Sequence, residues 1–135
     1  MSGSLNSWLR ERNFALSAHA IPGYSGPFEA VRDFLVVHGA KSLETLEFPL
    51  DQRSPAITIQ RRWEQGTQIQ SKEWRRPNRP PWTYPIDLLS QLSVPPDVWI
   101  AFDVLTIASA VRRSRRSRRL VVGWHVDFVP PQHQG

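Results

Sequence analysis

The sequence contains no cysteine among its 135 residues. Without cysteine the protein cannot build a disulfide framework, a thiolate metal site or a cysteine nucleophile, and the absence fits a reducing compartment. Long apolar runs are missing as well, since none reaches the roughly 20 uncharged residues that span a bilayer. The opening stretch MSGSLNSWLRERN also lacks the apolar core of a signal peptide. We therefore expect a cytoplasmic protein that is at most attached to a membrane surface.

Three common catalytic motifs are also missing from the sequence. It contains no HExxH, no GxSxG and no Walker motif, so a zinc protease, a serine hydrolase and a P-loop enzyme all lack support. One histidine and one aspartate two positions apart, as in His125-Val126-Asp127, do not complete a metal site. We expect no metal and no bound cofactor.

The residues that are present give a globular composition with an excess of positive charge. Hydrophobic residues make up 40% of the chain and charged residues 21%, with a formal net charge of +5. A chain of this length falls in the size range of one domain. We expect residues 13–130 to form that domain, residues 1–12 a flexible N-terminus and residues 131–135 a disordered tail.

The first part of the domain predicts a strand, a helix and a second strand. Asn13 to His19 is apolar enough for a buried strand, and Leu43 to Leu50 alternates as a strand does. Between them, FEAVRDFLVVHG is typical of a helix that begins near Pro27 and ends at Gly39. The side of this helix that faces the sheet should carry Phe28, Val31, Phe34 and Leu35.

The remainder predicts a hairpin and a second unit of strand, helix and strand. ITIQRRW and TQIQSKEW alternate on either side of Glu-Gln-Gly, which favours a hairpin or an excursion at the sheet edge. RRPNRPPWTYP predicts an extended loop, followed by the short helical candidate IDLLSQLS. The last third predicts a strand at Val98 to Phe102, a helix at Leu105 to Arg119 and a strand at Leu120 to Phe128. The pattern favours an α/β fold in a single domain, with a Rossmann-like, mostly parallel sheet and flanking helices.

One candidate site is the loop after the first predicted strand. In open α/β sheets, ligands bind beyond the carboxyl ends of the strands. The loop from His19 to Pro27 should lie there, and Gly23 and Gly26 would let backbone amides approach an anionic ligand at the helix N-terminus. The spacing is not a GxGxxG fingerprint, and the alternative is a plain loop with a capping glycine.

Three more residues follow or end predicted strands. Asp103 would accept a hydrogen bond from a hydroxylated substrate or act as a general base, or it would cap the next helix. His125 and Asp127 share one face of the last strand, either as cleft residues or as a hydrogen-bonded structural pair.

A run of arginines would surround most of the last predicted helix. The two interpretations are a solvated outer face and a contact surface for RNA or anionic lipid headgroups. Trp63, Trp74 and Trp82 lie beside other arginines, which would suit stacking on bases or sugars or contact with a membrane interface. No RNP1-like, KH-like or zinc-finger pattern accompanies them, and this weakens the nucleic-acid interpretation. The arginines of the run are Arg112, Arg113, Arg115, Arg116, Arg118 and Arg119.

The order of these segments resembles the N-terminal domain of GT-B glycosyltransferases. The resemblance is carried by SAHAIPGYSGPFEAVRDFLVVHG, LETLEFPL, PDVWIAFDVLTIASAVRRSRR and LVVGWHVDFVP, between Asn13 and Pro130. It implies that His19 and the Gly23–Gly26 loop line the acceptor side of a sugar-transfer cleft, with Asp103 and Asp127 at neighbouring strand ends.

The resemblance also implies a reaction and a partner. A sugar would pass from a nucleotide or lipid-phosphate donor to an acceptor hydroxyl, with a carboxylate or histidine as general base and no bound metal. Because GT-B enzymes bind the donor in a second domain, we expect this chain to be truncated before that domain, inactive alone, and dependent on a separate donor-binding domain or subunit. The alternative function is that of a basic α/β module that binds nucleic acid or another macromolecule.

Overall fold

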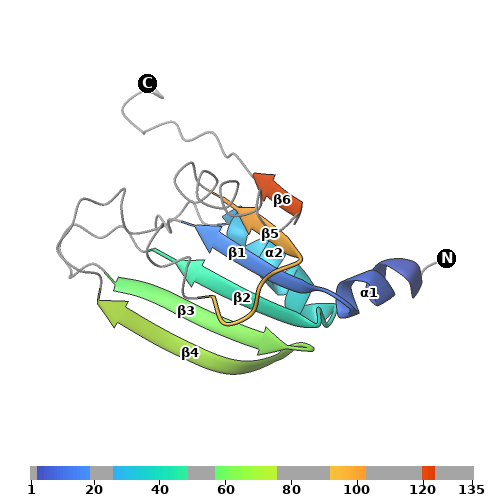
Figure 1. The fold of residues 1–135 in the computed structure, drawn as a ribbon, viewed down its shortest axis with the longest axis horizontal. Helices are drawn as coiled ribbons and strands as arrows, with labels where there is room; N and C mark the ends of the chain where they lie inside the picture. Colours follow the sequence, from blue (N-terminus) through green and yellow to red (C-terminus); the bar gives the residue numbers. More distant parts are fainter. Residues whose placement is uncertain (1–2, 19–25, 49–56, 76–91, 103–119, 124–135) are drawn as a thin grey trace.

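The computed structural model describes residues 3–18, 26–48, 57–75, 92–102 and 120–123 (Figure 1). Within these residues lie two helices and six strands, and the strands form one sheet in the order β4-β3-β2-β1-β5-β6. The elements are α1 (Gly3–Arg10), β1 (Asn13–Ala18), α2 (Gly26–Val37), β2 (Ser42–Glu47), β3 (Ile57–Glu64), β4 (Thr67–Arg75), β5 (Val98–Ala101) and β6 (Leu120–Gly123).

The sheet is mixed, so the predicted Rossmann-like, mostly parallel sheet with flanking helices is wrong. One half is parallel, because β1 pairs with β2 and β5, and β5 pairs with β6. The other half is antiparallel, because β3 runs against β2 and β4 runs against β3. The connection from β2 to β3 covers residues 48–56, whereas a parallel crossover needs roughly a dozen residues or more. In the described part of the chain, α2 is the helix that covers a face of the sheet (Figure 1).

The predicted unit of strand, helix and strand is confirmed for β1, α2 and β2. The two strands are aligned in parallel over their full lengths. The inward side of α2 buries Phe28 and Leu35, with Val31 packed against the same cluster. Phe34, also predicted to face inward, is exposed, and its ring lies against the His38 ring with centroids 4.3 Å apart. Phe28 and Leu35 are two helical turns apart, whereas Phe34 is rotated by about 100° from Leu35.

The sheet buries a cluster of side chains on each face. On the face covered by α2, the cluster includes Leu16, Leu43, Trp63 and Leu9. Leu9 belongs to α1, so the first twelve residues, expected to be a flexible N-terminus, include a helix that packs on the core. On the opposite face the apolar cluster is Ala15, Leu46, Phe48, Trp99 and Ala101.

The face opposite α2 is crossed by residues 92–97, which we call the strap. In Figure 1 the strap passes in front of β2 and β1 before it enters β5. At one end Leu92 packs against the apolar cluster of this face. At the other end the Asp97 backbone N–H donates to the Asn13 carbonyl at 2.7 Å, and the Asn13 N–H donates to the Asp97 carboxylate at 2.8 Å. These bonds hold β5 beside β1.

The predicted hairpin is confirmed by β3 and β4. Gln65 and Gly66 connect the strands with φ angles of 48° and 85°. Two positive φ values in a two-residue turn match the right-handed twist of the flanking strands. A side chain at Gly66 would begin 2.9 Å from the Val36 carbonyl oxygen, so the hairpin turn and the end of α2 lie in close contact.

Candidate functional site

The candidate site lies where three parallel strands end side by side. β1 is flanked by β2 and β5, and all three run in the same direction. Beyond the last strand pairs, the Phe48 N–H donates to the Ala18 carbonyl and the Phe102 N–H donates to the Ser17 carbonyl, both at 2.9 Å. The chain leaves β1 for α2 and β2 on one side, and leaves β5 for β6 on the other. Such a divergence is where open α/β sheets bind ligands.

Two of the predicted cleft residues come directly after these strand ends in the sequence. His19 follows Ala18, the last residue of β1, and Asp103 follows Phe102, one position beyond β5. Ser17 is aligned with Ala101, so the two strand ends are neighbours. His19 and Asp103 themselves lie outside the described residues.

Of the other predicted site residues, Gly26 alone is described. It is the first residue of α2, and a Cβ built at this position would have no neighbour within 4 Å. This position fits the start of a helix, and it leaves both the capping and the ligand-binding interpretation in place. The predicted residues outside the described ranges are Gly23, His125 and Asp127 and the arginines Arg112, Arg113, Arg115, Arg116, Arg118 and Arg119.

A partly buried carboxylate at the same edge was missed by the sequence reasoning. Glu47 is the last residue of β2, and its side chain is 12% exposed. The Arg61 guanidinium donates to its carboxylate at 2.5 Å. Burial raises the pKa of Glu47 above its ordinary value, and the charges of Arg61 and Arg32 counter this only in part. Its position at the end of a strand next to a helix N-terminus was the signal available in the sequence.

The Glu47 cluster has both a structural and a chemical capacity. Its ion pair with Arg61 joins β2 to β3, and the charge of Arg32 on α2 also favours the Glu47 carboxylate, whereas the charge of Glu29 opposes it. A carboxyl group whose pKa is raised accepts a proton more readily near neutral pH, as a general base must. Its strong ion pair with Arg61 equally fits a structural role.

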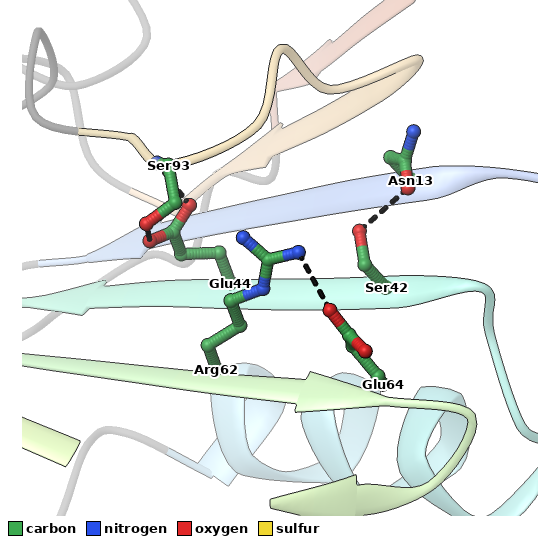
Figure 2. Close-up of polar contacts among 6 residues, drawn as sticks. All are labelled: Asn13, Ser42, Glu44, Arg62, Glu64 and Ser93. Carbon is green, nitrogen blue, oxygen red and sulfur yellow. Dashed lines mark hydrogen bonds and ion pairs between the residues drawn. The ribbon is translucent and has the colours of Figure 1, made fainter. Parts of the chain in front are cut away.

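A second buried carboxylate, Glu44, lies on the face of β2 that the strap crosses, and it makes three hydrogen bonds. It accepts from the Ser93 backbone N–H at 2.8 Å and from the Ser93 hydroxyl at 2.9 Å (Figure 2). The third bond comes from the Gln60 amide at 2.5 Å. Because these donors occupy both carboxylate oxygens, Glu44 fastens the strap to the sheet, and we assign it a structural role.

The two basic residues on β3 are paired with acids. Arg61 binds Glu47, and the Arg62 guanidinium donates to Glu64 at 2.9 Å (Figure 2). Trp63, predicted to stack on bases or sugars, is instead buried opposite Leu43 in the core of the α2 face. Trp74 is partly buried against the cluster on the other face. On β3 and β4, therefore, these tryptophans do not form an open stacking platform for nucleic acid.

The described residues contain no group of three or more His, Cys, Asp or Glu side chains that could hold a metal ion. Among the helices of the described ranges, none is long and apolar enough to cross a membrane. No protein-family model and no curated protein matches this chain.

Proposed function

We propose that this chain is the acceptor-side half of a cytoplasmic, two-domain glycosyltransferase and that it does not transfer sugar by itself. The observation that carries the proposal is the shared end of β1 and β5, where Ser17 is aligned with Ala101. His19 and Asp103 follow these neighbouring ends in the sequence. An imidazole and a carboxylate are the groups that bind sugar hydroxyls and accept their protons.

The parallel half of the sheet also supports this role. α2 begins at the carboxyl edge, so its N-terminal backbone amides favour an anionic or electron-rich oxygen there. In the proposed reaction a carboxylate or histidine takes the proton from the acceptor hydroxyl as that oxygen attacks the anomeric carbon of the donor sugar. The departing phosphate would be stabilised by a donor-binding domain supplied separately, and without it the reacting atoms are not held together.

Binding experiments on the purified chain test both parts of this proposal. Saturation-transfer NMR would be recorded with free hexoses as acceptors, and with UDP-glucose and a short-chain polyprenyl-phosphate sugar as donors. We expect signals from at least one acceptor and none from either donor. Asp103→Asn should abolish the acceptor signal, whereas Asp33→Asn, an exposed aspartate on α2, should leave it unchanged.

Two results would count against the proposal. Robust sugar transfer by the purified chain would contradict its inactivity, and equal acceptor signals from the wild type and Asp103→Asn would remove Asp103 from the site. Binding of oligonucleotides that weakens steeply with salt would favour the nucleic-acid function instead. Replacing Arg115, Arg116, Arg118 and Arg119 by alanine would then show whether the basic run is the contact surface.

A further inference from the structure

Exposed apolar side chains gather at the amino edge of the parallel strands, opposite the candidate site. Among the described residues five large apolar side chains are exposed, and four of them lie on the two helices. The fifth, Ile69, lies on the edge strand β4. We call the four helical residues the amino-edge patch: Leu5 (55% exposed), Trp8 (37%), Phe34 (44%) and Val37 (79%).

Contacts between α1 and α2 join these residues into one surface. The Asn6 side chain forms a hydrogen bond with the His38 ring at 3.1 Å, and the Phe34 ring lies against the same imidazole. Leu5 precedes Asn6 and Val37 precedes His38, so the patch extends across the junction of the two helices. Figure 1 shows α1 projecting beyond the sheet at this end of the molecule.

The patch is bordered by positive charge. The Arg12 guanidinium lies over the Trp8 ring, 4.4 Å from the ring centroid. Arg10 lines an open hollow of about 740 Å³ with Val37 and His38, and among the described residues it has no ion-pair partner. Lys41 is exposed next to the same edge. Acidic residues are also present at this edge: Glu11 faces Arg12 at 3.9 Å, and Asp33 pairs with Arg32 at 3.1 Å.

We propose that the amino-edge patch docks on the surface of a membrane that contains anionic lipid. Leu5, Trp8 and Val37 would enter the interface, where tryptophan rings are favoured, and Arg10 and Arg12 would reach the headgroup phosphates. An amphipathic helix with apolar and cationic sides binds such interfaces by apolar burial together with attraction to anionic lipid. The net charge of +5 adds to that attraction. This inference does not depend on the proposed sugar transfer.

Charge and shape favour a membrane over the other occupants of an apolar patch. A second copy would bring together two surfaces bordered by Arg10, Arg12 and Lys41, and their like charges repel each other. An amphipathic partner helix needs an apolar groove, whereas the hollow beside Val37 is lined by Arg10, His38 and Gln65. A lipid surface accepts the projecting α1 (Figure 1) and supplies the negative charge. Docking there leaves the carboxyl edge of the sheet turned away from the membrane.

The experiment is sedimentation of the purified chain with vesicles of phosphatidylcholine alone and with vesicles of phosphatidylcholine and phosphatidylglycerol in equal amounts. We expect binding to the mixed vesicles and much weaker binding to phosphatidylcholine alone. Leu5→Asn combined with Val37→Asn should weaken binding by roughly tenfold or more, because two apolar side chains leave the interface. Ile69→Asn is the control, since it removes an apolar side chain on β4 that is 51% exposed, close to the 55% of Leu5. Circular dichroism checks that each variant is folded.

A second measurement identifies the contact residue by residue. Brominated phosphatidylcholine quenches tryptophan fluorescence at the depth of the interface, and Trp8→Phe should remove most of this quenching. The proposal is overturned if the wild type does not bind mixed vesicles, if the patch variant binds like Ile69→Asn, or if quenching persists in Trp8→Phe. Binding that disappears only when Arg115, Arg116, Arg118 and Arg119 are replaced would also overturn it. A patch variant that turns a dimer into a monomer without vesicle binding would identify a second copy as the occupant.

Discussion

Replacement of Glu44 tests how the strap is held on the sheet. Glu44 is 4% exposed and accepts three hydrogen bonds, two from Ser93 and one from Gln60. Hydrogen bonds to a charged acceptor contribute about 1.5–3 kcal/mol each, and a buried donor left without a partner costs about 1–3 kcal/mol. Ser93 is exposed, so water can replace part of the hydrogen bonding that its N–H and hydroxyl lose. Gln60 is buried, so water cannot easily replace its bond to Glu44. We therefore expect Glu44→Ala to lower the free energy of unfolding by about 4 kcal/mol.

Urea unfolding followed by tryptophan fluorescence measures this loss, with Glu64→Ala as the control. Glu64 is on the neighbouring strand and its side chain is 50% exposed, whereas its partner Arg62 is 15% exposed, so Glu64→Ala should cost about 1–2 kcal/mol, less than Glu44→Ala. Domains have a total stability of about 5–15 kcal/mol, and Glu44→Ala could leave too little folded protein to measure. Glu44→Gln then serves, because it keeps one acceptor oxygen and should lose about 1–2 kcal/mol. Equal stability of Glu44→Ala and Glu64→Ala would refute the assignment of Glu44 as the residue that fastens the strap.

Two further predictions follow from single positions. Gly66→Ala should lower the free energy of unfolding, measured by urea titration, by about 1–3 kcal/mol, because the φ of Gly66 is +85° and a Cβ there would meet the Val36 carbonyl oxygen. Gly26→Ala is the control and should change the free energy of unfolding by less than about 1 kcal/mol, because a Cβ there meets no atom within 4 Å. The raised pKa of Glu47 means that the folded protein binds a proton at this carboxyl more tightly than the unfolded chain does. This proton binding adds to the free energy of unfolding at pH values below the ordinary pKa of 4.5, and the contribution is lost as pH rises through the raised pKa. The stability of the wild type minus that of Glu47→Gln should therefore fall as pH rises from below 4.5, and a difference that stays flat or rises across this window would contradict the burial argument.

Local patterns in the sequence predicted most of the elements but not the direction of the strands. The apolar run of β1, the helical spacing of Phe28 and Leu35 and the Gln65-Gly66 turn each depend on nearby residues, and each prediction is confirmed. Strand direction depends instead on the length of the connections. The short link of residues 48–56 was the available signal that β3 runs against β2.

The environment of single side chains was harder to predict, because it depends on pairings distant in the sequence. Trp63 stands beside arginines in the chain, yet its alignment with Leu43 places it in the core. Glu44 lies on the face of β2 opposite α2, where Leu46 and Phe48 form part of the apolar cluster. Its burial is tolerated because Ser93, 49 positions away, supplies two hydrogen bonds. No local pattern contains that information.

The position of Asn13 has a consequence for the order in which the sheet assembles. Its side chain accepts a hydrogen bond from Ser42, 29 positions away, and its backbone binds Asp97, 84 positions away. Contacts between distant residues are slow to form, and the N-terminal part of a chain leaves the ribosome first. During synthesis β1 can therefore pair with β2, with α2 packed on them, while the other edge of β1 is still unpaired because β5 has not yet been made. An unpaired central strand recruits strands from other chains, so fast closure of the strap would protect the newly made protein from aggregation.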